Sequence, residues 1–372
     1  MLIGVPKETK VQEYRVGLTP ESVRELAGHG HRVVVQRDAG AGIGVSDAEY
    51  AAAGAVVAAS AEEVFRQAEL IVKVKEPLAQ ERAWLRAGQA LFAYLHLAPD
   101  AEQTRDLVRS GAVAIAYETV TSPAGGLPLL APMSVVAGRM AVQVAAHFLE
   151  RVHGGRGILL AGATGVPPGR VLILGAGTVG SNAALIALGI GAEVTVLSRS
   201  SGPLERLKAE HGARLTTGIS TPQAIGEALR GADAVIATAL VPGGVAPKLV
   251  TRTMLGGMKQ GAVVVDVSID QGGCLETSRP TVHVDPVFSV DGIIHYCVPN
   301  MPGAVPRTST YALNRATLPF VMELADRGVT RALRENEHLR NGLNVCRGAV
   351  TRREVADARG YPYTEPMRAL GS

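Results

Sequence analysis

The sequence predicts an α/β protein of two doubly wound domains with a cleft between them, and three observations lead to this class. The 372 residues exceed one ordinary domain and suit two of about 150 to 200 residues each. Hydrophobic residues make up 47% but aromatics only 4%, so the cores are built from aliphatic side chains, as in buried parallel sheets. The 43 glycines fit the many tight turns of a chain that alternates strands and helices.

Charge and cysteine content exclude several classes of protein. The 37 Lys and Arg and 34 Asp and Glu leave a net charge of +3 and are spread along the chain, which argues against nucleic-acid binding. Cys274, Cys297 and Cys346 show no CxxC spacing, so we expect neither a disulfide framework nor a metal site, and the cytoplasm is the simpler setting. The first apolar run is too short for a signal peptide. Glycines interrupt the uncharged run 171–192, which favours a strand, turn and helix over a membrane span.

Strand and helix patterns alternate along the first half of the chain. Thr19 and Pro20 resemble a helix start, with Thr19 as the N-cap. Short apolar runs suited to buried strands occur at 2–5, 32–35, 70–74, 90–95 and 112–116. This first α/β unit fills about 128 residues. A helix over 134–152 follows, and we interpret it as a connection between domains.

A second α/β series follows the connecting helix. Its expected strands are 171–174, 193–197, 234–237 and 262–267, and the series is complete by about residue 300. From 309 to 327 the pattern is helical, and further helical stretches are expected up to the C-terminus. These last residues are too few for a third domain; the pattern alone allows packing on either domain.

The strongest local motif is GAGTVG at 175–180, placed directly after one strand and directly before a helix. Gly175 permits the tight turn, Gly177 lets the backbone approach a pyrophosphate, and Gly180 allows close packing of helix on strand. In this frame the motif predicts a Rossmann-like dinucleotide site. The alternative is a glycine-rich turn that binds no ligand.

The end of the next strand bears on which dinucleotide binds. An acidic residue there would bind the ribose 2′-hydroxyl of NAD, but this chain has Ser198 followed by Arg199. Without a carboxylate nothing repels a 2′-phosphate, and both side chains are donors. We therefore expect tolerance of NADP. The alternative is that Arg199 lies on the surface and NAD binds through other contacts.

Three polar residues of the first domain follow predicted strands: Arg15, Lys75 and His96. If the strands are parallel, all three lie along one sheet edge. A guanidinium pairs with carboxylates, an ammonium polarises a carbonyl, and an imidazole exchanges protons near neutral pH. Taken singly, each has another explanation: a loop charge, a solvated amine or a packed histidine. Their coincidence favours an active site.

Asp270 follows the strand 262–267 of the second domain, so its carboxylate is expected at the same sheet edge as the glycine turn. It is a candidate base or a partner of a cation. Turn initiation before Gly272 and Gly273 explains it equally well.

At this point the sequence closely resembles the alanine dehydrogenase family. The motifs that carry the resemblance are 1–8 (MLIGVPKE), 15–20 (RVGLTP), 73–77 (KVKEP), 94–97 (YLHL), 266–273 (DVSIDQGG) and 300–310 (NMPGAVPRTST), and the similarity covers essentially the whole chain. The resemblance implies a cytosolic, homo-hexameric enzyme that interconverts L-alanine with pyruvate and ammonia through NAD(H). It also implies that 1–128 and 307–372 form the substrate domain and 129–306 the dinucleotide-binding domain.

Residue roles implied by the resemblance transfer position by position. Arg15 and Lys75 would hold the substrate carboxylate, Lys75 and His96 would polarise the carbonyl or imine, and Asp270 would assist proton transfer. Asn300 and Met301 would line the pocket near the substrate. The positions around the cofactor would be Ser134, Gly175, Gly177, Gly180, Ser220, Leu240, Asp270 and Val298. Hinges are expected near 129–134 and 300–307.

Two departures from the family pattern and one rival function remain. The family usually has an aspartate at the position of Ser198, so its NAD preference does not transfer, and Pro299 replaces a more usual alanine, which removes an amide donor next to Asn300. The rival is a non-catalytic dinucleotide-binding subunit like the transhydrogenase α subunit. Lys75 and His96 favour the dehydrogenase.

Overall fold

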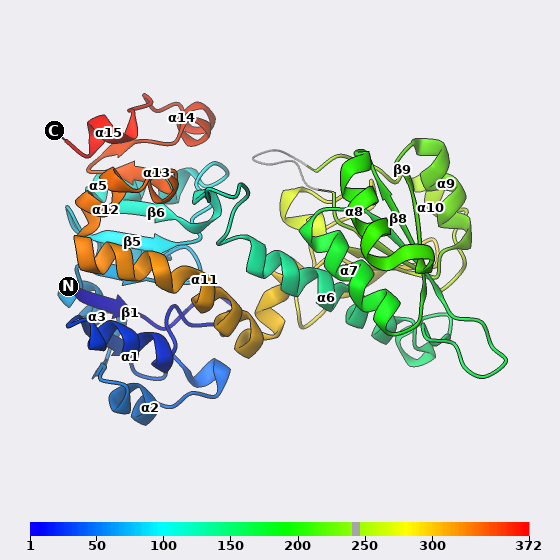
Figure 1. Cartoon of the computed structure of the whole chain (residues 1–372), viewed down its shortest axis with the longest axis horizontal. Helices are drawn as coiled ribbons and strands as arrows, with labels where there is room; N and C mark the ends of the chain where they lie inside the picture. Colours follow the sequence, from blue (N-terminus) through cyan, green and yellow to red (C-terminus); the bar gives the residue numbers. More distant parts are fainter. Residues whose placement is uncertain (240–245, 372) are drawn as a thin grey trace. The chain divides into compact units, whose positions relative to one another are not determined.

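The computed structural model describes residues 1–239 and 246–371, which form two compact units. Met1–Met133 and Gly303–Ser372 make up the first unit, and Ser134–Pro302 make up the second (Figure 1). Each unit contains one sheet with helices packed on it, and both are of the Rossmann type that the sequence predicts.

The first unit contains an eight-stranded sheet with the order β15-β14-β6-β5-β4-β1-β2-β3. The six strands from β6 to β3 are parallel, and β14 joins β6 antiparallel. The strands are β1 Leu2–Val5, β2 Arg32–Gln36, β3 Val56–Ala58, β4 Leu70–Val72, β5 Ala90–Ala93, β6 Val113–Ala116, β14 Leu343–Cys346 and β15 Ala349–Val350. The strand order reverses between β1 and β4, which is the topological switch point of a doubly wound sheet.

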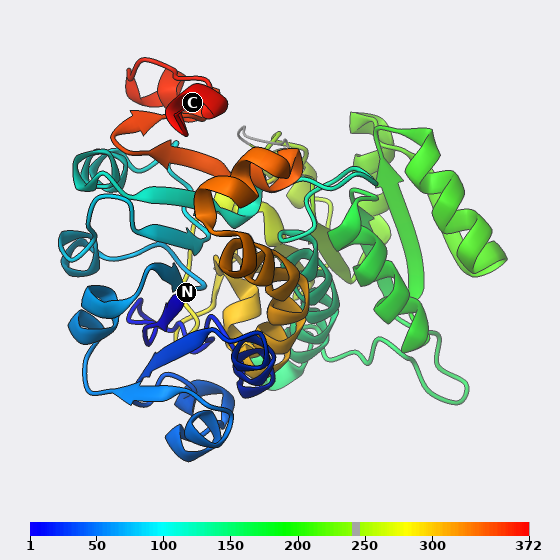
Figure 2. The same cartoon turned by 60° about the vertical axis from the view of Figure 1, so that its left-hand side comes forward.

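Helices cover both faces of this sheet (Figure 2). Leu91 and Ile71 belong to a buried aliphatic cluster with Phe65 and Leu107 from helices of one face. On α1, Thr19 is the N-cap, as predicted, because its side chain accepts from the amide of Ser22. The helices are α1 Pro20–Gly28, α2 Asp47–Ala52, α3 Ala61–Gln67, α4 Ala79–Ala83, α5 Ala101–Ser110, α11 Pro306–Arg327, α12 Val329–Glu335, α13 Glu337–Arg340, α14 Arg353–Arg359 and α15 Pro366–Ala369.

The last seventy residues return to the first sheet. Helix α11 packs beside α1, where the Asn314 side chain accepts from the amide of Thr19 at 2.8 Å (Figure 1). The further helical stretches predicted beyond residue 327 are present as α12 to α15, but the strands β14 and β15, which extend the sheet from β6, were not predicted. Asn344 interrupts the apolar character of the four-residue β14, so the sequence pattern does not reveal this strand.

The second unit contains a seven-stranded sheet with the order β12-β13-β11-β10-β7-β8-β9, parallel except for β12. Its switch point lies between β7 and β10. The strands are β7 Arg170–Leu174, β8 Glu193–Ser198, β9 Leu215–Ile219, β10 Ala234–Ala237, β11 Val263–Asp266, β12 Val287–Val290 and β13 Ile293–Tyr296; the helices are α6 Ala131–Phe148, α7 Thr178–Gly189, α8 Ser201–His211, α9 Pro222–Gly231 and α10 Arg252–Leu255.

The fold shows what the long uncharged segment forms and where the three cysteines lie. The uncharged run 171–192 forms β7, a turn and α7. Among the described helices, none is both long and apolar enough to cross a bilayer. The three cysteines are free and buried.

Candidate active site

The switch point of the first sheet collects the polar residues that the sequence singled out. Strands β1, β4 and β5 are adjacent and parallel, so their carboxyl ends meet at one edge. Arg15 lies in the loop after β1, Lys75 follows β4, and His96 follows β5. Ligands of open α/β sheets bind beyond this edge, at the switch point. The structure therefore places all three residues where a ligand is expected.

Arg15 is held by a carboxylate from its own loop. Its guanidinium donates from Nε and Nη2 to the two carboxylate oxygens of Glu13, at 2.6 and 2.5 Å, and from Nη1 to the Met133 sulfur at 3.0 Å. Burial, with 2% exposed, would lower the pKa of Arg15, but the hydrogen bond and charge of Glu13 raise it. The ion pair thus keeps the guanidinium charged and fixes its plane.

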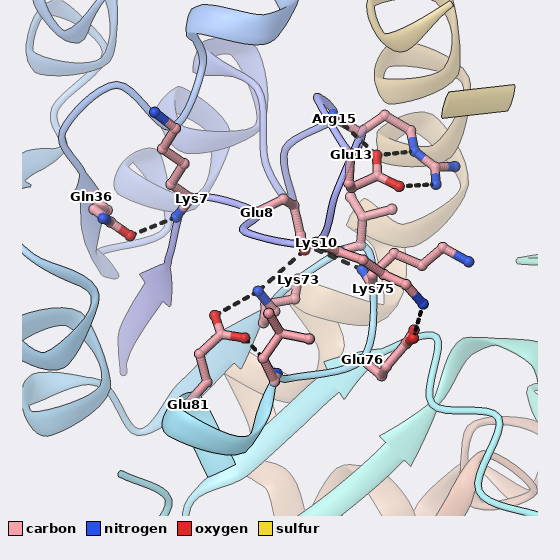
Figure 3. Close-up of polar contacts among 12 residues, drawn as sticks. Lys7, Glu8, Lys10, Glu13, Arg15, Gln36, Lys73, Lys75, Glu76 and Glu81 are labelled. Atoms are coloured by element: carbon pink, nitrogen blue, oxygen red, sulfur yellow. Dashed lines mark hydrogen bonds and ion pairs between the residues drawn. The ribbon is translucent and has the colours of Figure 1, made fainter. Parts of the chain in front are cut away.

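A buried ionic network lies beneath Lys75 (Figure 3). The Lys73 ammonium contacts Glu8 at 3.2 Å and Glu81 at 2.8 Å. Burial alone would lower the pKa of Lys73, but the two carboxylates raise it. Burial raises the pKa of Glu8 despite the charge of Lys73. The network contains two carboxylates and one ammonium, so its ionised form carries one excess negative charge.

Lys75 itself is partly buried and follows this network in the chain. Its neighbour Glu76 pairs with Lys10 from the loop after β1 (Figure 3). Burial would raise the pKa of Glu76, but the charges of Lys75 and Lys10 lower it. The segment after β4 is therefore tied to the loop after β1 by charge pairs on both sides of Lys75.

His96 is the most accessible of the three residues, with its side chain 48% exposed. Its backbone φ of +49° lies in the left-handed region, which is strained for a non-glycine residue and is common at functional sites. Glu118 stabilises this turn, because its carboxylate accepts from the amide of His96 at 2.7 Å and lies 3.8 Å from Nδ1. The imidazole lies parallel to the Tyr94 ring, with 6.0 Å between centroids.

The glycine motif of the second unit has the geometry of a dinucleotide turn. Gly175 has a φ of +116°, which disfavours any other residue. A Cβ on Gly180 would lie 1.9 Å from the carbonyl oxygen of Gly175, so helix α7 packs against the turn as closely as glycine allows. Gly177 is the N-cap of α7, and a Cβ there would meet no atom within 4 Å. The backbone before α7 therefore faces open space, which fits a pyrophosphate at the N-terminal amides.

Ser198 and Ser220 lie together at the carboxyl ends of β8 and β9, where the amide of Ser220 donates to the carbonyl of Ser198 at 2.9 Å. Both side chains are half-buried, and Arg199 is exposed. A ribose bound by the glycine turn reaches the end of the second strand in folds of this type. A 2′-phosphate there would meet a hydroxyl and a guanidinium.

Two carboxylates at the end of β11 and in the turn after it differ in burial and in hydrogen bonding. Asp266 is buried and accepts from the amides of Ser268 and Cys274 at 3.1 and 2.7 Å and from the hydroxyl of Ser278 at 2.6 Å. Asp270 lies four residues later, exposed, in the 3₁₀ turn Val267–Gln271. Asp266 therefore shapes the loop, and Asp270 is presented on it.

The remaining predicted residues are spread over three segments. Val298 is buried just after β13, and Asn300 has a φ of +61° before the buried Met301, which begins a 3₁₀ turn. Ser134 lies half-buried in the first turn of α6. Leu240 lies outside the described residues. The roles of these residues stay predictions.

Sequence reasoning assigned no role to Glu8, Glu13, Lys73 or Glu118. Glu8 and Lys73 belong to motifs that carried the family resemblance, and Glu13 is two residues from Arg15. These positions were signals that partners of the cations lay nearby. Only the fold shows which partners they contact: Glu8 pairs with Lys73, Glu13 with Arg15, and Glu118 with the turn at His96.

Comparisons with known proteins agree with this geometry. The family model "Alanine dehydrogenase/PNT, C-terminal domain" matches residues 141–353, and the corresponding N-terminal domain model matches 4–137. An alanine dehydrogenase of Halomonas elongata is 57% identical over 371 residues and covers 100% of both chains.

Solved structures lead to the same family. A structure of an L-alanine dehydrogenase superposes with a TM-score of 0.93 at 49% identity, covering 96% of this chain and 99% of that one. A transhydrogenase from Sinorhizobium meliloti shares the fold with a TM-score of 0.82 at 26% identity, covering 95% of this chain and 99% of that one. The chain belongs to the alanine dehydrogenase/PNT family.

Proposed function

We propose that this chain catalyses the reversible oxidative deamination of L-alanine to pyruvate and ammonia, with hydride transfer to a nicotinamide dinucleotide. The observation that carries the proposal is the convergence of Arg15, Lys75 and His96 at the switch point of one sheet. The glycine turn at the switch point of the other sheet supports it, as does full-length identity of 57% to an alanine dehydrogenase.

Substrate binding is assigned to the unit that contains 1–128 and 307–372. Arg15 and Lys75 supply positive charge for the substrate carboxylate, and Glu13 orients the guanidinium through its two hydrogen bonds. Lys75 follows β4 by three residues, and Arg15 lies in the loop after the neighbouring β1, where its bidentate pair with Glu13 fixes the guanidinium. Asn300 and Met301 are proposed as further substrate-binding residues.

Chemistry at the α-carbon follows from the charges available. When bound, the nicotinamide would supply the acceptor for the α-hydrogen as hydride; loss of this hydride and of one proton from nitrogen would turn the amine into an imine. Lys75 and His96 polarise the imine, or the carbonyl in the reverse direction, and stabilise developing negative charge on oxygen. His96 is the most accessible of the three residues, and its imidazole is proposed to pass a proton to or from the substrate. Asp270 is proposed to assist proton transfer as water adds and ammonia leaves.

The second unit, Ser134–Pro302, which lies within the predicted range 129–306, is assigned to the dinucleotide. Gly175, Gly177 and Gly180 are proposed to hold the pyrophosphate at α7. Tolerance of NADP beside NAD is proposed because Ser198 and Arg199 replace a repelling carboxylate. The further proposed contacts are Ser134, Ser220, Leu240, Asp270 and Val298. Homo-hexameric assembly and a cytoplasmic location are proposed on family grounds.

The test is turnover by the purified chain alone with pyruvate, ammonia and reduced dinucleotide. Lys75→Ala and His96→Ala are each expected to lower kcat/KM for pyruvate by about 100-fold or more, because a charged donor to a developing oxyanion is lost. Lys7→Ala, which removes an exposed lysine of the loop after β1, is the matched control. A variant that keeps more than about a tenth of wild-type activity with unchanged KM refutes the role of its residue.

The rival function makes a different prediction for the same assay. A dinucleotide-binding subunit like the transhydrogenase α subunit would bind the reduced dinucleotide, show no turnover with amino or oxo acids, and need a membrane partner. Binding without turnover would therefore favour the rival.

A further inference from the structure

We propose that Glu8 is a positioning residue for Lys75, which it directs through two main-chain hydrogen bonds; this inference rests on the proposed function. The chain leaves the sheet after Val72, where the regular ladder of β4 ends. Glu8 Oε1 then accepts from the amide of Val74 at 2.6 Å and from that of Lys75 at 3.3 Å (Figure 3). These amides lie beyond the end of β4, so the carboxylate replaces the ladder as their acceptor.

The backbone at Lys75 is therefore set by a side chain from a different strand end. The path of this backbone segment fixes the direction in which the Lys75 side chain leaves the main chain. On the other side of the segment, the carbonyl of Val74 accepts from the amide of Tyr94 at 3.1 Å, which ties it to the chain after β5. Glu8 and the chain after β5 thus hold the segment from two sides, and Glu8 contacts the amide of Lys75 itself.

The two carboxylate oxygens of Glu8 bind different partners. Oε1 binds the main chain, while Oε2 contacts the Lys73 ammonium at 3.2 Å. Lys73 also donates to Glu81 at 2.8 Å, and the other oxygen of Glu81 accepts from the amide of Leu78 before α4. The side chains of Glu8, Lys73 and Glu81 are at most 4% exposed. Packing and charge therefore prevent Glu8 from turning away from the main chain.

This division of tasks allows variants that separate positioning from fold stability. Glu8→Gln keeps the length and the carbonyl oxygen that accepts from the two amides, but loses the charge. Glu8→Asp keeps the charge but is shorter by one methylene group. Glu81→Ala is the matched control, because it damages the same buried network and makes no hydrogen bond to residues 74 or 75.

The experiment measures kcat and KM for pyruvate, the Kd of the reduced dinucleotide, and thermal unfolding for the full-length variants. We expect Glu8→Ala and Glu8→Asp to lower kcat/KM by roughly 10- to 100-fold, because a displacement of about 1 Å at a catalytic group has an effect of that size. Glu8→Gln should keep at least a third of the wild-type value, and Glu81→Ala should lie within threefold despite a lower unfolding temperature. The dinucleotide Kd should stay unchanged in all four.

Two results overturn the positioning role: Glu8→Asp as active as Glu8→Gln, or Glu81→Ala as inactive as Glu8→Asp. If Glu8→Ala does not fold, the Asp and Gln variants decide alone. A wild-type chain without turnover would overturn the proposed function instead, so the two failures are distinct.

A separate observation, at the end of α6, carries a second inference: we propose that His147, Glu150 and His153 bind a divalent transition-metal ion such as Zn²⁺. One ligand atom from each residue lies within 4.8 Å of the others, so the three face a common point. Glu150 is 3.7 Å from His147 Nδ1 and 3.6 Å from His153 Nε2. Two imidazole nitrogens and one carboxylate oxygen form a ligand set that zinc prefers, with water completing the tetrahedron.

The surroundings support a cation at this place. His147 lies in the last turn of the long α6 helix and Glu150 follows the helix, so both are at its C-terminal end, where the helix dipole is negative. The ring of Phe148 packs edge-on against His147 at 5.0 Å and against His153 at 5.7 Å between centroids. Phe148 is itself 9% exposed, so a buried ring orders both imidazoles before any ion binds.

Isothermal titration of the chelator-treated full-length chain with ZnCl₂ tests this site. We expect one saturable site per chain, at least tenfold weaker in His147→Ala, Glu150→Gln and His153→Ala and unaffected by excess Mg²⁺, which prefers oxygen ligands. His29→Ala, which removes an exposed histidine beside Asp326, is the control and should bind like wild type. Absence of saturable binding, or equal loss in the control, overturns the proposal.

Discussion

The glycine turn after β7 gives a sharp test of dinucleotide binding, because two of its glycines have opposite surroundings. A methyl group on Gly177 meets no atom within 4 Å, whereas one on Gly180 would lie 1.9 Å from the carbonyl oxygen of Gly175. Gly177 also has a φ of −77° and a ψ of −170°, which alanine adopts without strain. Gly177→Ala should therefore fold normally and place its methyl group in the space before α7.

The size of the effect follows from the bonds that the methyl group displaces. A hydrogen bond from a backbone amide to a charged phosphate oxygen contributes about 1.5 to 3 kcal/mol, so losing one raises the dinucleotide Kd by about 10- to 100-fold. The unfolding free energy should change by no more than about 1 kcal/mol, the usual range for an N-cap substitution. Gly180→Ala should instead destabilise the fold by about 1 to 3 kcal/mol or more through overpacking.

Fluorescence titration with reduced dinucleotide measures the Kd, and urea unfolding measures stability, for both variants. KM for pyruvate should change little in Gly177→Ala when the dinucleotide is saturating, because Arg15 and Lys75 belong to the other unit. A Gly177→Ala variant that binds the dinucleotide as tightly as wild type refutes the assignment of the pyrophosphate to this turn. A strongly destabilised Gly177→Ala would show that the space before α7 is not open.

Cofactor choice and pH dependence give the remaining predictions. Ser198→Asp should shift the ratio of kcat/KM values toward NAD by at least about tenfold, and Arg199→Ala should weaken NADP(H) selectively; a strictly NAD-dependent wild type would contradict both. Burial lowers the pKa of His295 in the folded chain, so on acidification this histidine takes up a proton in the unfolded chain first. The contribution of His295 to the free energy of unfolding is therefore complete above about pH 6.5. Below that pH the free energy of unfolding falls by at most about 1.4 kcal/mol per pH unit. Urea unfolding at several pH values should show this slope, and His295→Gln should reduce it. Lys73→Met should lower the unfolding free energy by about 3 to 5 kcal/mol, measured the same way, because it leaves two buried carboxylates without their shared cation; a loss below about 1 kcal/mol would contradict the network.

Local signals in the sequence were sufficient for much of the fold. Strands β1 and β10 begin and end where the apolar runs indicate, and the cap at Thr19 forms as predicted. The glycine spacing located the turn after β7, because the three glycines that it needs all lie within six residues of sequence. Strand β14 was missed because its place is fixed by pairing with β6, more than two hundred residues away.

The same distinction between local and distant partners explains what could be learned of the candidate site. A phosphate group is met by main-chain amides, which every residue except proline has, so the sequence requirement is glycine where a side chain would obstruct, and that requirement is visible at 175–180. A carboxylate substrate needs fixed cations, and a buried cation needs carboxylates of its own. The buried Lys73 has two such carboxylates, Glu8 from the loop after β1 and Glu81 from α4, and Glu8 also accepts from the main-chain amide of Lys75. The sequence shows the cations but not which carboxylates hold them, because that pairing exists only once β1 and β4 lie side by side. For this reason residues such as Glu8 should affect activity without contacting substrate, and they are found from the contacts in the fold.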